Sequence, residues 1–260
     1  MPVICLHDKK TIELFLRKNI DLHIYSLGDL DDFFWPYTTW YALTINDTPE
    51  AVALLYTGLP LPTLLALSEQ PEIMTDLLKS LIPILPDKFY AHLSPGLENV
   101  FREGFDLKPH GEHYKMILKD LSVVKQVDCS LVIRLSQADL NEIIQLFKES
   151  YPGNWFDSRM LETNQYFGIR EDGKLVSIAG VHVFSEKYRV AALGNITTHP
   201  SRRGKGYGKL VTARLCQSLS QNIDHIGLNV KSDNHSAISC YRKLGFEICA
   251  SFGEFMVRRK

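Results

Sequence analysis

The segment that most constrains the fold is SRRGKGYGKL, Ser201 to Leu210, in which three glycines alternate with basic residues. A β-rich run precedes it, and apolar residues at four-residue steps follow it. This order predicts a strand, a glycine loop and the start of a helix. Glycine lacks Cβ, so the N–H groups of such a loop can approach one ligand. The helix then adds its own free N–H groups and the positive end of its dipole. The segment predicts an anion site, and a pyrophosphate fits this length of donors better than a carboxylate. The alternative is a basic loop that is only solvated.

Composition limits the partners of this site. The chain has 260 residues and a formal net charge of -1, which argues against a general nucleic-acid or anionic membrane surface. No stretch reaches the roughly 18 to 20 apolar residues of a membrane-spanning helix. The five cysteines lack the CxxC spacing of a zinc or redox site, so we expect reduced thiols. We therefore expect a soluble cytoplasmic protein that binds neither nucleic acid nor membrane.

One order of elements occurs twice along the chain. The segment FYAHLSPGLENVFREGF (residues 89–105) resembles IGLNVKSDNHSAISCYRKLGF (residues 226–246), since each pattern predicts a strand, a short helix and a Gly-Phe pair. This similarity predicts an old internal duplication. We place the domains at residues 1–125 and 126–260, with a linker near residues 120–130.

The two halves differ where the glycine loop lies. At the corresponding place the first half has LLALSEQPEIMTDLLK, in which Glu69, Pro71 and Glu72 offer no glycine and the wrong charge for a phosphate. The sequence therefore predicts the anion site in the second half only.

Three nucleotide-binding motifs can be compared with the loop. A Walker loop requires Ser or Thr after Gly-Lys, but Leu210 follows Lys209. A dinucleotide fingerprint requires a third glycine or alanine, and that place falls on Lys209 or Val211. The pattern Arg/Gln-x-x-Gly-x-Gly/Ala, in contrast, is satisfied by Arg203, Gly206 and Gly208.

With this motif, residues 132–259 resemble the GNAT superfamily of N-acetyltransferases. The similarity rests on the strand LGNITTHP, the loop SRRGKGYG, the strand IGLNVK and the segment DNHSAISCYRKLGF. Within the superfamily the chain looks most like the glycine N-acyltransferase branch, whose members carry a GNAT-like N-terminal half. The resemblance implies an α/β (α+β) fold in which helices flank a mixed, mostly antiparallel, twisted sheet. It also implies two tandem GNAT-like folds, the first of them degenerate.

The resemblance further implies that acetyl-CoA, or another acyl-CoA, lies between two strands that splay apart. Backbone groups of one strand would pair with the pantetheine amides, the glycine loop would hold the pyrophosphate, and a residue at the start of the next helix would contact CoA. The implied cofactor-binding residues are Ile196, Thr197, Thr198, Arg203, Gly204, Lys205, Gly206, Tyr207, Gly208, Lys209 and Asn234. Asn234 is also a plausible helix cap, and the two roles are compatible.

Tyr241 matches the family's general acid, the phenol that donates to the departing sulfur. The alternative is core packing, because Ile238, Tyr241 and Leu244 form a stripe at three-residue steps. Many family members carry a Glu on a splayed strand as the base. This chain has uncharged residues at those places, residues 191–193 and 229.

The remaining candidates for the base are His182 in GVHVF and, more weakly, Glu162. A structural role for His182 is equally compatible with the sequence. At pH 7 an α-amine costs only about 1 to 1.4 kcal/mol to deprotonate, against about 4 to 5 kcal/mol for a lysine. A weak or water-relayed base therefore suits an α-amine or a small amino acid.

The segment at residues 151–167 corresponds to a wall of the acceptor pocket in the resembling family. Trp155, Phe156, Arg159 and Tyr166 are candidates to shape it, with Arg159 available to a substrate carboxylate. Loop packing is the alternative for the aromatic residues.

Two other patterns are weak. The histidines of PHGEH (residues 109–113) lack a second group of ligands, so we expect no metal. Cys240 lacks the partners of a catalytic thiol, and a buried structural role is more consistent with its place.

These observations lead us to expect an acyl-CoA-dependent N-acyltransferase, most readily an acetyltransferase, that acts on a primary amine of a small molecule or amino acid by direct attack. The alternatives are a noncatalytic acyl-CoA-binding sensor and an N-acetyltransferase acting on a protein amine. Both a monomer and a homodimer are compatible with the sequence.

Overall fold

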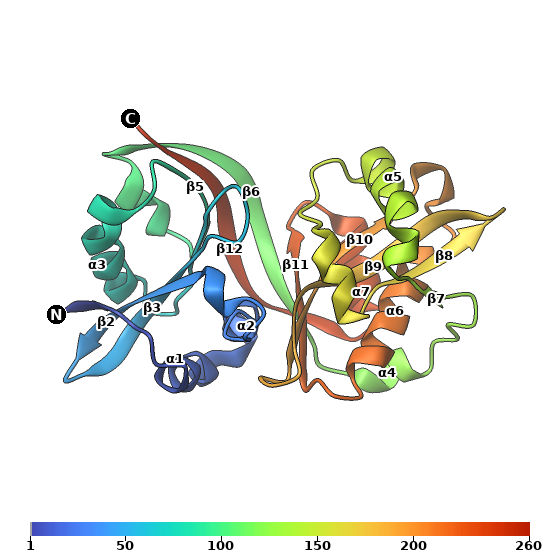
Figure 1. The fold of residues 1–260 in the computed structure, drawn as a ribbon, viewed down its shortest axis with the longest axis horizontal. Helices are drawn as coiled ribbons and strands as arrows, with labels where there is room; N and C mark the ends of the chain where they lie inside the picture. Colours follow the sequence, from blue (N-terminus) through green and yellow to red (C-terminus); the bar gives the residue numbers. More distant parts are fainter. Residues whose placement is uncertain (1) are drawn as a thin grey trace. The chain divides into compact units, whose positions relative to one another are not determined.

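The computed structural model describes residues 2–260 and divides into two compact units (Figure 1). Of the described residues, the first unit contains 2–115, 231–233 and 248–260, and the second contains 116–230 and 234–247. The sequence-based boundary at 125/126 follows the repeated pattern, whereas these units are defined by packing. The last strand therefore belongs mainly to the first unit, although it lies at the end of the second half of the sequence.

The first unit contains a mixed sheet in the order β1-β2-β3-β4-β5-β12-β6. β4 and β5 are parallel, with Thr63 opposite Tyr90 and Ala66 opposite Leu93. β12 is antiparallel to β5 from Gly253↔Leu93 to Arg258↔Lys88. The strands are β1 (Val3–Cys5), β2 (Thr38–Ile45), β3 (Thr48–Tyr56), β4 (Thr63–Ala66), β5 (Lys88–Leu93), β6 (Phe105–Leu118) and β12 (Phe246–Arg259). The helices are α1 (Lys9–Leu16), α2 (Ile20–Gly28) and α3 (Pro71–Leu81), with short 3-10 turns η1 (Arg17–Asn19), η2 (Trp35–Tyr37), η3 (Ile82–Ile84) and η4 (Leu97–Phe101).

The core of the first unit follows from the two periodicities of helix and strand. α3 buries Met74, Leu78 and Leu81, which share one helical face, and β5 buries the alternate residues Phe89 and Leu93 in the same cluster. On β12, Phe252 packs instead with Leu22 of α2 and with Leu67.

The second unit contains the sheet order β11-β10-β9-β8-β7. Its strands are β7 (Ile133–Arg134), β8 (Phe167–Glu171), β9 (Lys174–Ser185), β10 (Val190–Thr198) and β11 (His225–Lys231). Its helices are α4 (Leu121–Lys125), α5 (Leu140–Ser150), α6 (Tyr207–Leu219) and α7 (His235–Arg242), with 3-10 turns η5 (Gln137–Asp139), η6 (Ser158–Thr163) and η7 (Pro200–Arg202). The β10–β11 pair is parallel, and the β7–β8, β8–β9 and β9–β10 pairs are antiparallel.

Several expectations for the second unit are met. Asp172 and Gly173 turn the β8–β9 hairpin with φ of 53° and 76°, the sign that an Asp-Gly hairpin turn requires. α6 buries Val211, Leu215 and Leu219, as their four-residue spacing predicts. In α5, Ile143, Leu146 and Phe147 are buried and Ile144 is exposed. The predicted fold class, a mixed and mostly antiparallel sheet flanked by helices, is confirmed.

Among the described residues, none of the helices has both the length and the apolar character needed to cross a membrane.

Candidate functional site

The strands β10 and β11 stop pairing half-way along β10. They are in register from Val190↔His225 to Leu193↔Leu228, and in the described chain no further residue pairs join them. Beyond that point β10 continues to pair with β9, through Gly194↔Gly180 and Thr197↔Ile178. Backbone groups of β10 that would face β11 are therefore left to other partners. The structure thus opens the sheet at the strand that holds the predicted residues Ile196, Thr197 and Thr198.

The loop after β10 leads into the N-terminus of the 13-residue helix α6. Gly204 and Gly206 have φ of 81° and 83°, a backbone region that favours glycine, and a Cβ built on either residue would meet only open space. Gly206 is the N-cap and provides no side-chain cap. In the described part of the chain, the amides of residues 204–209 have no hydrogen-bond acceptor. This run of free N–H groups is the arrangement that binds phosphate at helix N-termini.

The cations of the loop are held in different ways. Arg203 Nε donates to the Thr198 carbonyl oxygen at 3.2 Å, so it folds back onto β10. Lys205 Nζ lies 2.7 Å from Glu171 Oε1 at the end of β8, and Arg202 also pairs with this carboxylate. The Tyr207 hydroxyl donates to the same oxygen at 3.2 Å. The hydrogen bond from Lys205, followed by those of its other partners, lowers the pKa of Glu171.

Glu171 was not among the residues that the sequence analysis selected. Its side chain ties Lys205 and Tyr207 to β8, whereas Lys209 forms no ion pair with a described residue. The acidic pair Glu171-Asp172, placed at a hairpin turn ahead of a basic loop, was the available signal. The β8–β9 turn and the basic loop lie close together because β8, β9 and β10 are neighbours in the sheet. The spacing of these residues along the sequence does not indicate that order.

The next helix, α7, carries two of the predicted residues. Asn234 caps it, because its Oδ1 accepts hydrogen bonds from the Ala237 amide at 3.2 Å and the Ser236 hydroxyl at 3.1 Å. The amide Nδ2 of Asn234 has no partner among the described residues and remains available as a donor. Asn234 therefore caps α7, which is one of the two roles that the sequence indicated. Only its Oδ1 is used in the cap, so its Nδ2 stays available to a ligand.

Tyr241 is buried on the same helix, and its ring lies 6.0 Å from that of Phe246. Burial is the largest cause that raises the pKa of Tyr241, and Cys240 and Tyr151 raise it further. The phenol therefore keeps its proton at neutral pH. Its hydroxyl has no hydrogen-bond partner in the part of the chain that the structure describes. Both predicted roles, packing and donation, suit this environment.

His182 lies at a bulge on β9. Ala192 pairs with Val183 and Leu193 with Val181, so His182 is the extra residue between them. Its ring occupies the space above Gly194, where a Cβ would lie 1.7 Å from Cδ2 of His182. The structure thus places the ring of the candidate base against Gly194 of β10, the strand that borders the opening. Glu162, the weaker candidate, is exposed in η6.

The predicted acceptor-wall residues are not equivalent. Arg159 forms an ion pair with Asp157 at 3.0 Å, and this contact lowers the pKa of the Asp157 carboxyl. Tyr166 has no exposed surface, so it is a core residue rather than part of a wall. Trp155 is 37% exposed, and Phe156 packs between Phe147 and Tyr166.

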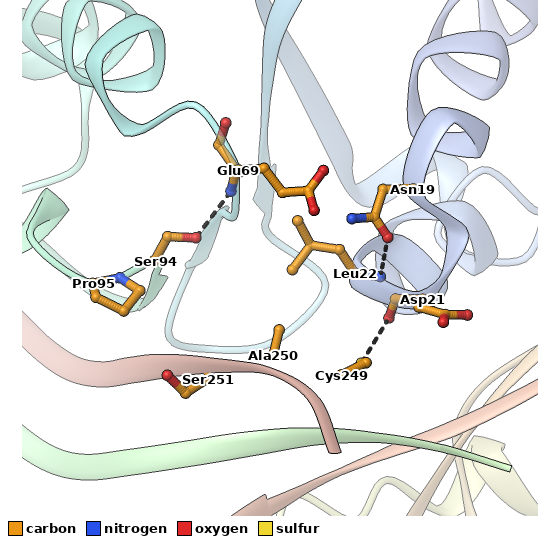
Figure 2. Close-up of a pocket in the computed structure, with 10 residues that line it drawn as sticks. Asn19, Asp21, Leu22, Glu69, Ser94, Pro95, Cys249, Ala250 and Ser251 are labelled. Atoms are coloured by element: carbon orange, nitrogen blue, oxygen red, sulfur yellow. Dashed lines mark hydrogen bonds between the residues drawn. The ribbon is translucent and has the colours of Figure 1, made fainter. Parts of the chain in front are cut away.

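The first unit has a cavity of about 350 Å³ beyond the carboxyl ends of β4 and β5. Figure 2 shows the Glu69 side chain extending toward Leu22 and Asn19, with the Ser94 hydroxyl bonded to the adjacent backbone. The lining residues are Asn19, Asp21, Leu22, Ser68, Glu69, Ser94, Pro95, Cys249, Ala250 and Ser251. This lining contains two carboxylates and no Lys or Arg among the described residues, so it does not suit a pyrophosphate.

The histidine segment PHGEH also lies in the first unit. Nε2 of His113 is 3.6 Å from Glu254 Oε2, and the Tyr90 hydroxyl donates to the same carboxylate at 2.5 Å. Within the described residues, no group of His, Cys, Asp or Glu side chains has an arrangement that could hold a metal ion.

Comparison with known proteins agrees with this geometry. Residues 140–246 match the Acetyltransferase (GNAT) family. An uncharacterised protein of Mycobacterium leprae is 32% identical over 124 residues, which cover 44% of this chain and 33% of that protein. The N-alpha-acetyltransferase RimI of Mycobacterium tuberculosis is 30% identical over 88 residues, which cover 32% of this chain and 52% of that protein. The chain thus spans between a third and about half of the length of these relatives.

Solved structures share the fold over nearly the whole chain. A Drosophila protein superposes with a TM-score of 0.75 at 12% identity and covers 98% of each chain. A putative GNAT-family acetyltransferase from Novosphingobium aromaticivorans gives 0.63 at 19% identity, covering 93% of this chain and 98% of its own. A tandem GNAT protein from the clavulanic acid biosynthesis pathway gives 0.57 at 13% identity, covering 99% and 98%. The chain is thus similar to the GNAT acetyltransferase family over residues 140–246, and it shares its fold with these solved structures over nearly its whole length.

Proposed function

We propose that the protein is an acyl-CoA-dependent N-acyltransferase that moves an acetyl group to a primary amine of a small molecule or amino acid. The observation that carries this proposal is the opening of the β10–β11 pair next to the free amides of residues 204–209. Strand β10 supports the binding of pantetheine amides through residues 196–198, and the amides support binding of the pyrophosphate. Asn234 adds a free donor at the start of α7.

In the proposed reaction, the neutral amine of the acceptor attacks the thioester carbonyl carbon and forms a tetrahedral intermediate. The C–S bond then breaks, the amide forms and CoA leaves as the thiolate, which takes up a proton from water. Tyr241 is suited to donate to the sulfur, because its raised pKa keeps the hydroxyl protonated. Complete transfer from this phenol to a thiolate of ordinary pKa near 8.5 is uphill. The phenol therefore stabilises the leaving sulfur chiefly as a hydrogen-bond donor.

The amine must lose a proton during the attack. The positions on β10 where a carboxylate base would be expected are Ala191, Ala192 and Leu193, and all three are buried and apolar. We assign this proton to His182, directly or through water, because its ring lies on Gly194 at the edge of the opening. Such a weak base favours an α-amine over a lysine side chain, since the α-amine deprotonates more easily at neutral pH.

The decisive experiment follows free thiol while the protein is incubated with acetyl-CoA and a panel of primary amines. The panel contains free amino acids, small amines without a carboxylate, and a peptide with a free N-terminus. Thiol release that depends on an amino acid or small amine supports the proposal. Release with the peptide alone would favour a protein acceptor, and the peptide is included because the Mycobacterium tuberculosis relative is named an N-alpha-acetyltransferase.

A noncatalytic acyl-CoA sensor is the second candidate, favoured by the apolar residues 191–193. Calorimetric titration with CoA tests it in parallel. Saturable binding without amine-dependent thiol release from any acceptor would support the sensor and reject the transferase.

A further inference from the structure

The sheet opens beside a bulge on β10. Between the pairs Gly194↔Gly180 and Thr197↔Ile178, β10 contributes Asn195 and Ile196 where β9 contributes one residue. A bulge of this kind bends the strand and increases its twist. The bulge begins after Gly194, one residue beyond Leu193, which is the last residue of β10 that pairs with β11. The bend therefore occurs at the point where the two strands separate.

A buried hydrogen-bond chain holds this bulge. Asn195 Nδ2 donates to the Tyr166 hydroxyl at 2.9 Å, and this hydroxyl donates to the Val181 carbonyl oxygen at 2.9 Å. Met160 Sδ also lies 3.4 Å from this hydroxyl and 3.5 Å from Asn195 Nδ2, but a thioether is a weaker acceptor than the closer Val181 carbonyl oxygen. With its single proton on Val181, the phenol oxygen accepts from Asn195, which fixes the orientation of the amide. Tyr166 and Asn195 are 0% and 2% exposed. The hydrogen-bond chain thus joins the residue that precedes β8 to β9 and β10 in a buried environment.

Two glycines make room for this arrangement. Gly180 and Gly194 are directly opposite each other, so their missing side chains would point to the same face of the sheet. A Cβ on Gly180 would lie 2.1 Å from the Tyr166 ring, and one on Gly194 would lie 1.7 Å from the His182 ring. Tyr166 and His182 therefore lie side by side on the backbone next to the bulge. A movement of the bulge would also displace His182.

Asn195 carries two features that oppose stability. Its φ is 53°, a left-handed conformation in which a side chain is strained, and its Oδ1 is buried without a partner among the described residues. A glycine at position 195 would remove both. Asparagine is therefore explained better by the hydrogen bond that it gives to Tyr166 than by folding alone.

We propose that Asn195 and Tyr166 are positioning residues for acyl-CoA. They hold the bulge that separates β10 from β11, and thereby set the backbone of residues 196–198 and the ring of His182. This inference rests on the proposed function. Neither side chain takes part in the chemistry, and both act through the strand that they fix.

The test uses Asn195→Gly, Tyr166→Phe and the double variant of the full chain. Glycine accepts the positive φ and phenylalanine keeps the ring on Gly180, so each single change removes the amide–phenol link with little change in packing. Asn164→Gly is the matched control, because Asn164 has φ of 56° in the same unit and is exposed at the C-cap of η6. We measure the Kd for CoA by calorimetry, kcat and KM with acetyl-CoA, and the midpoint of unfolding in denaturant.

Each single variant is expected to lower kcat/KM for acetyl-CoA and CoA affinity by about tenfold or more, since displacements of about 1 Å have effects of this order. The double variant is expected to be no worse than the more severe single variant, because both changes break the same link. Asn164→Gly should match the wild type. If Tyr166→Phe lowers the unfolding midpoint, the kcat/KM and CoA affinity of Asn195→Gly alone test the inference.

Two results would overturn the inference while leaving the transferase intact. One is a folded Asn195→Gly protein with wild-type kcat/KM and CoA affinity, and the other is fully additive losses in the double variant. A wild-type protein that neither binds CoA nor releases thiol would instead reject the proposed function, and the positioning role with it.

Discussion

Two parallel strand pairs among the described residues, β4–β5 and β10–β11, end in different ways. Past β4 and β5 the chain stays bonded, because the Ser94 amide donates to the Ala66 carbonyl oxygen at 3.2 Å and the Ser94 hydroxyl accepts from the Ser68 amide at 2.9 Å. Past Leu193 and Leu228, β10 and β11 separate. The same order of elements therefore does not by itself create an opening. One serine closes the first pair, and a bulge on β10 accompanies the opening of the second.

The helices α3 and α6, which follow β4 and β10, also differ in the backbone donors that they leave free. α3 begins at Pro71, which has no N–H to donate, and carries Glu72 in its first turn. α6 begins after Gly206 and presents free amides without an acidic residue in its first turn. A helix N-terminus in this protein thus becomes an anion site only where donors are present and acidic side chains are absent.

The largest expected effect is on the glycine loop. Gly206→Glu should lower CoA affinity by about 100-fold or more, equivalent to about 2.8 kcal/mol, because it introduces a negative side chain among the phosphate donors. Gln70→Glu alters the corresponding N-cap of α3 and should leave CoA affinity unchanged. Calorimetric titration with CoA measures both. Equal effects of the two changes would remove the distinction between the helices.

Tyr241→Phe tests the chemical step that we assign to the second unit. The buried ring is retained, so CoA affinity should stay within about twofold of the wild type, while kcat falls by about 100-fold or more through loss of the donor. Single-turnover kinetics with saturating acetyl-CoA measure the step. Wild-type kcat in a folded Tyr241→Phe protein would remove the assignment of the acid.

Ser94→Ala tests the closure of the first pair. The Ser68 amide would lose its acceptor, and we expect a loss of about 1 to 2 kcal/mol in the free energy of unfolding. CoA affinity should not change, because the cavity there has carboxylates and no basic lining. Denaturant unfolding and calorimetry check the two parts. If Ser94→Ala gained CoA binding, Ser94 alone would account for the difference between the β4–β5 and β10–β11 pairs.

The smallest expected effect is a pH dependence of the first unit. Burial lowers the pKa of His92 to about 4 and of His23 to about 3, below the ordinary value of 6.5. In the unfolded chain both histidines take up protons as the pH falls below 6.5, whereas in the folded protein they stay neutral down to about pH 4. The free energy of unfolding that they contribute is therefore complete above pH 6.5 and is lost toward pH 4. Burial raises the pKa of Asp29 to about 8, so this group has the opposite effect on the free energy of unfolding. It involves one proton, against two for the histidines, and the loss of stability at low pH therefore prevails.

The measurement is denaturant unfolding at pH 7 and pH 5, followed by the fluorescence of Trp35 and Trp40, which both lie in the first unit. The unfolding midpoint should be lower at pH 5. His92→Gln should reduce the difference between the two pH values. An unchanged midpoint in the wild type would contradict the assignment of these histidines as neutral buried groups.

The sequence by itself predicted the elements whose signals are local. The glycine pattern predicted the loop and the start of α6, and the four-residue spacing of the apolar residues that follow predicted the buried face of α6. These features depend on backbone preferences and side-chain periodicity within a few residues. The absence of glycine before Pro71 likewise predicted that the first half lacks the loop.

Only the tertiary structure decided the features that depend on strand neighbours. The pairing of β12 with β5, the ion pair between Glu171 and Lys205, and the hydrogen bond between Asn195 and Tyr166 join residues 29 to about 170 positions apart. Tyr166, for which the sequence left a pocket wall and packing as alternatives, is buried, and Gly180 leaves space for its ring. Sequence periodicity states which face of a strand is apolar. It does not state which strand lies beside it, and the opening between β10 and β11 depends on those neighbours.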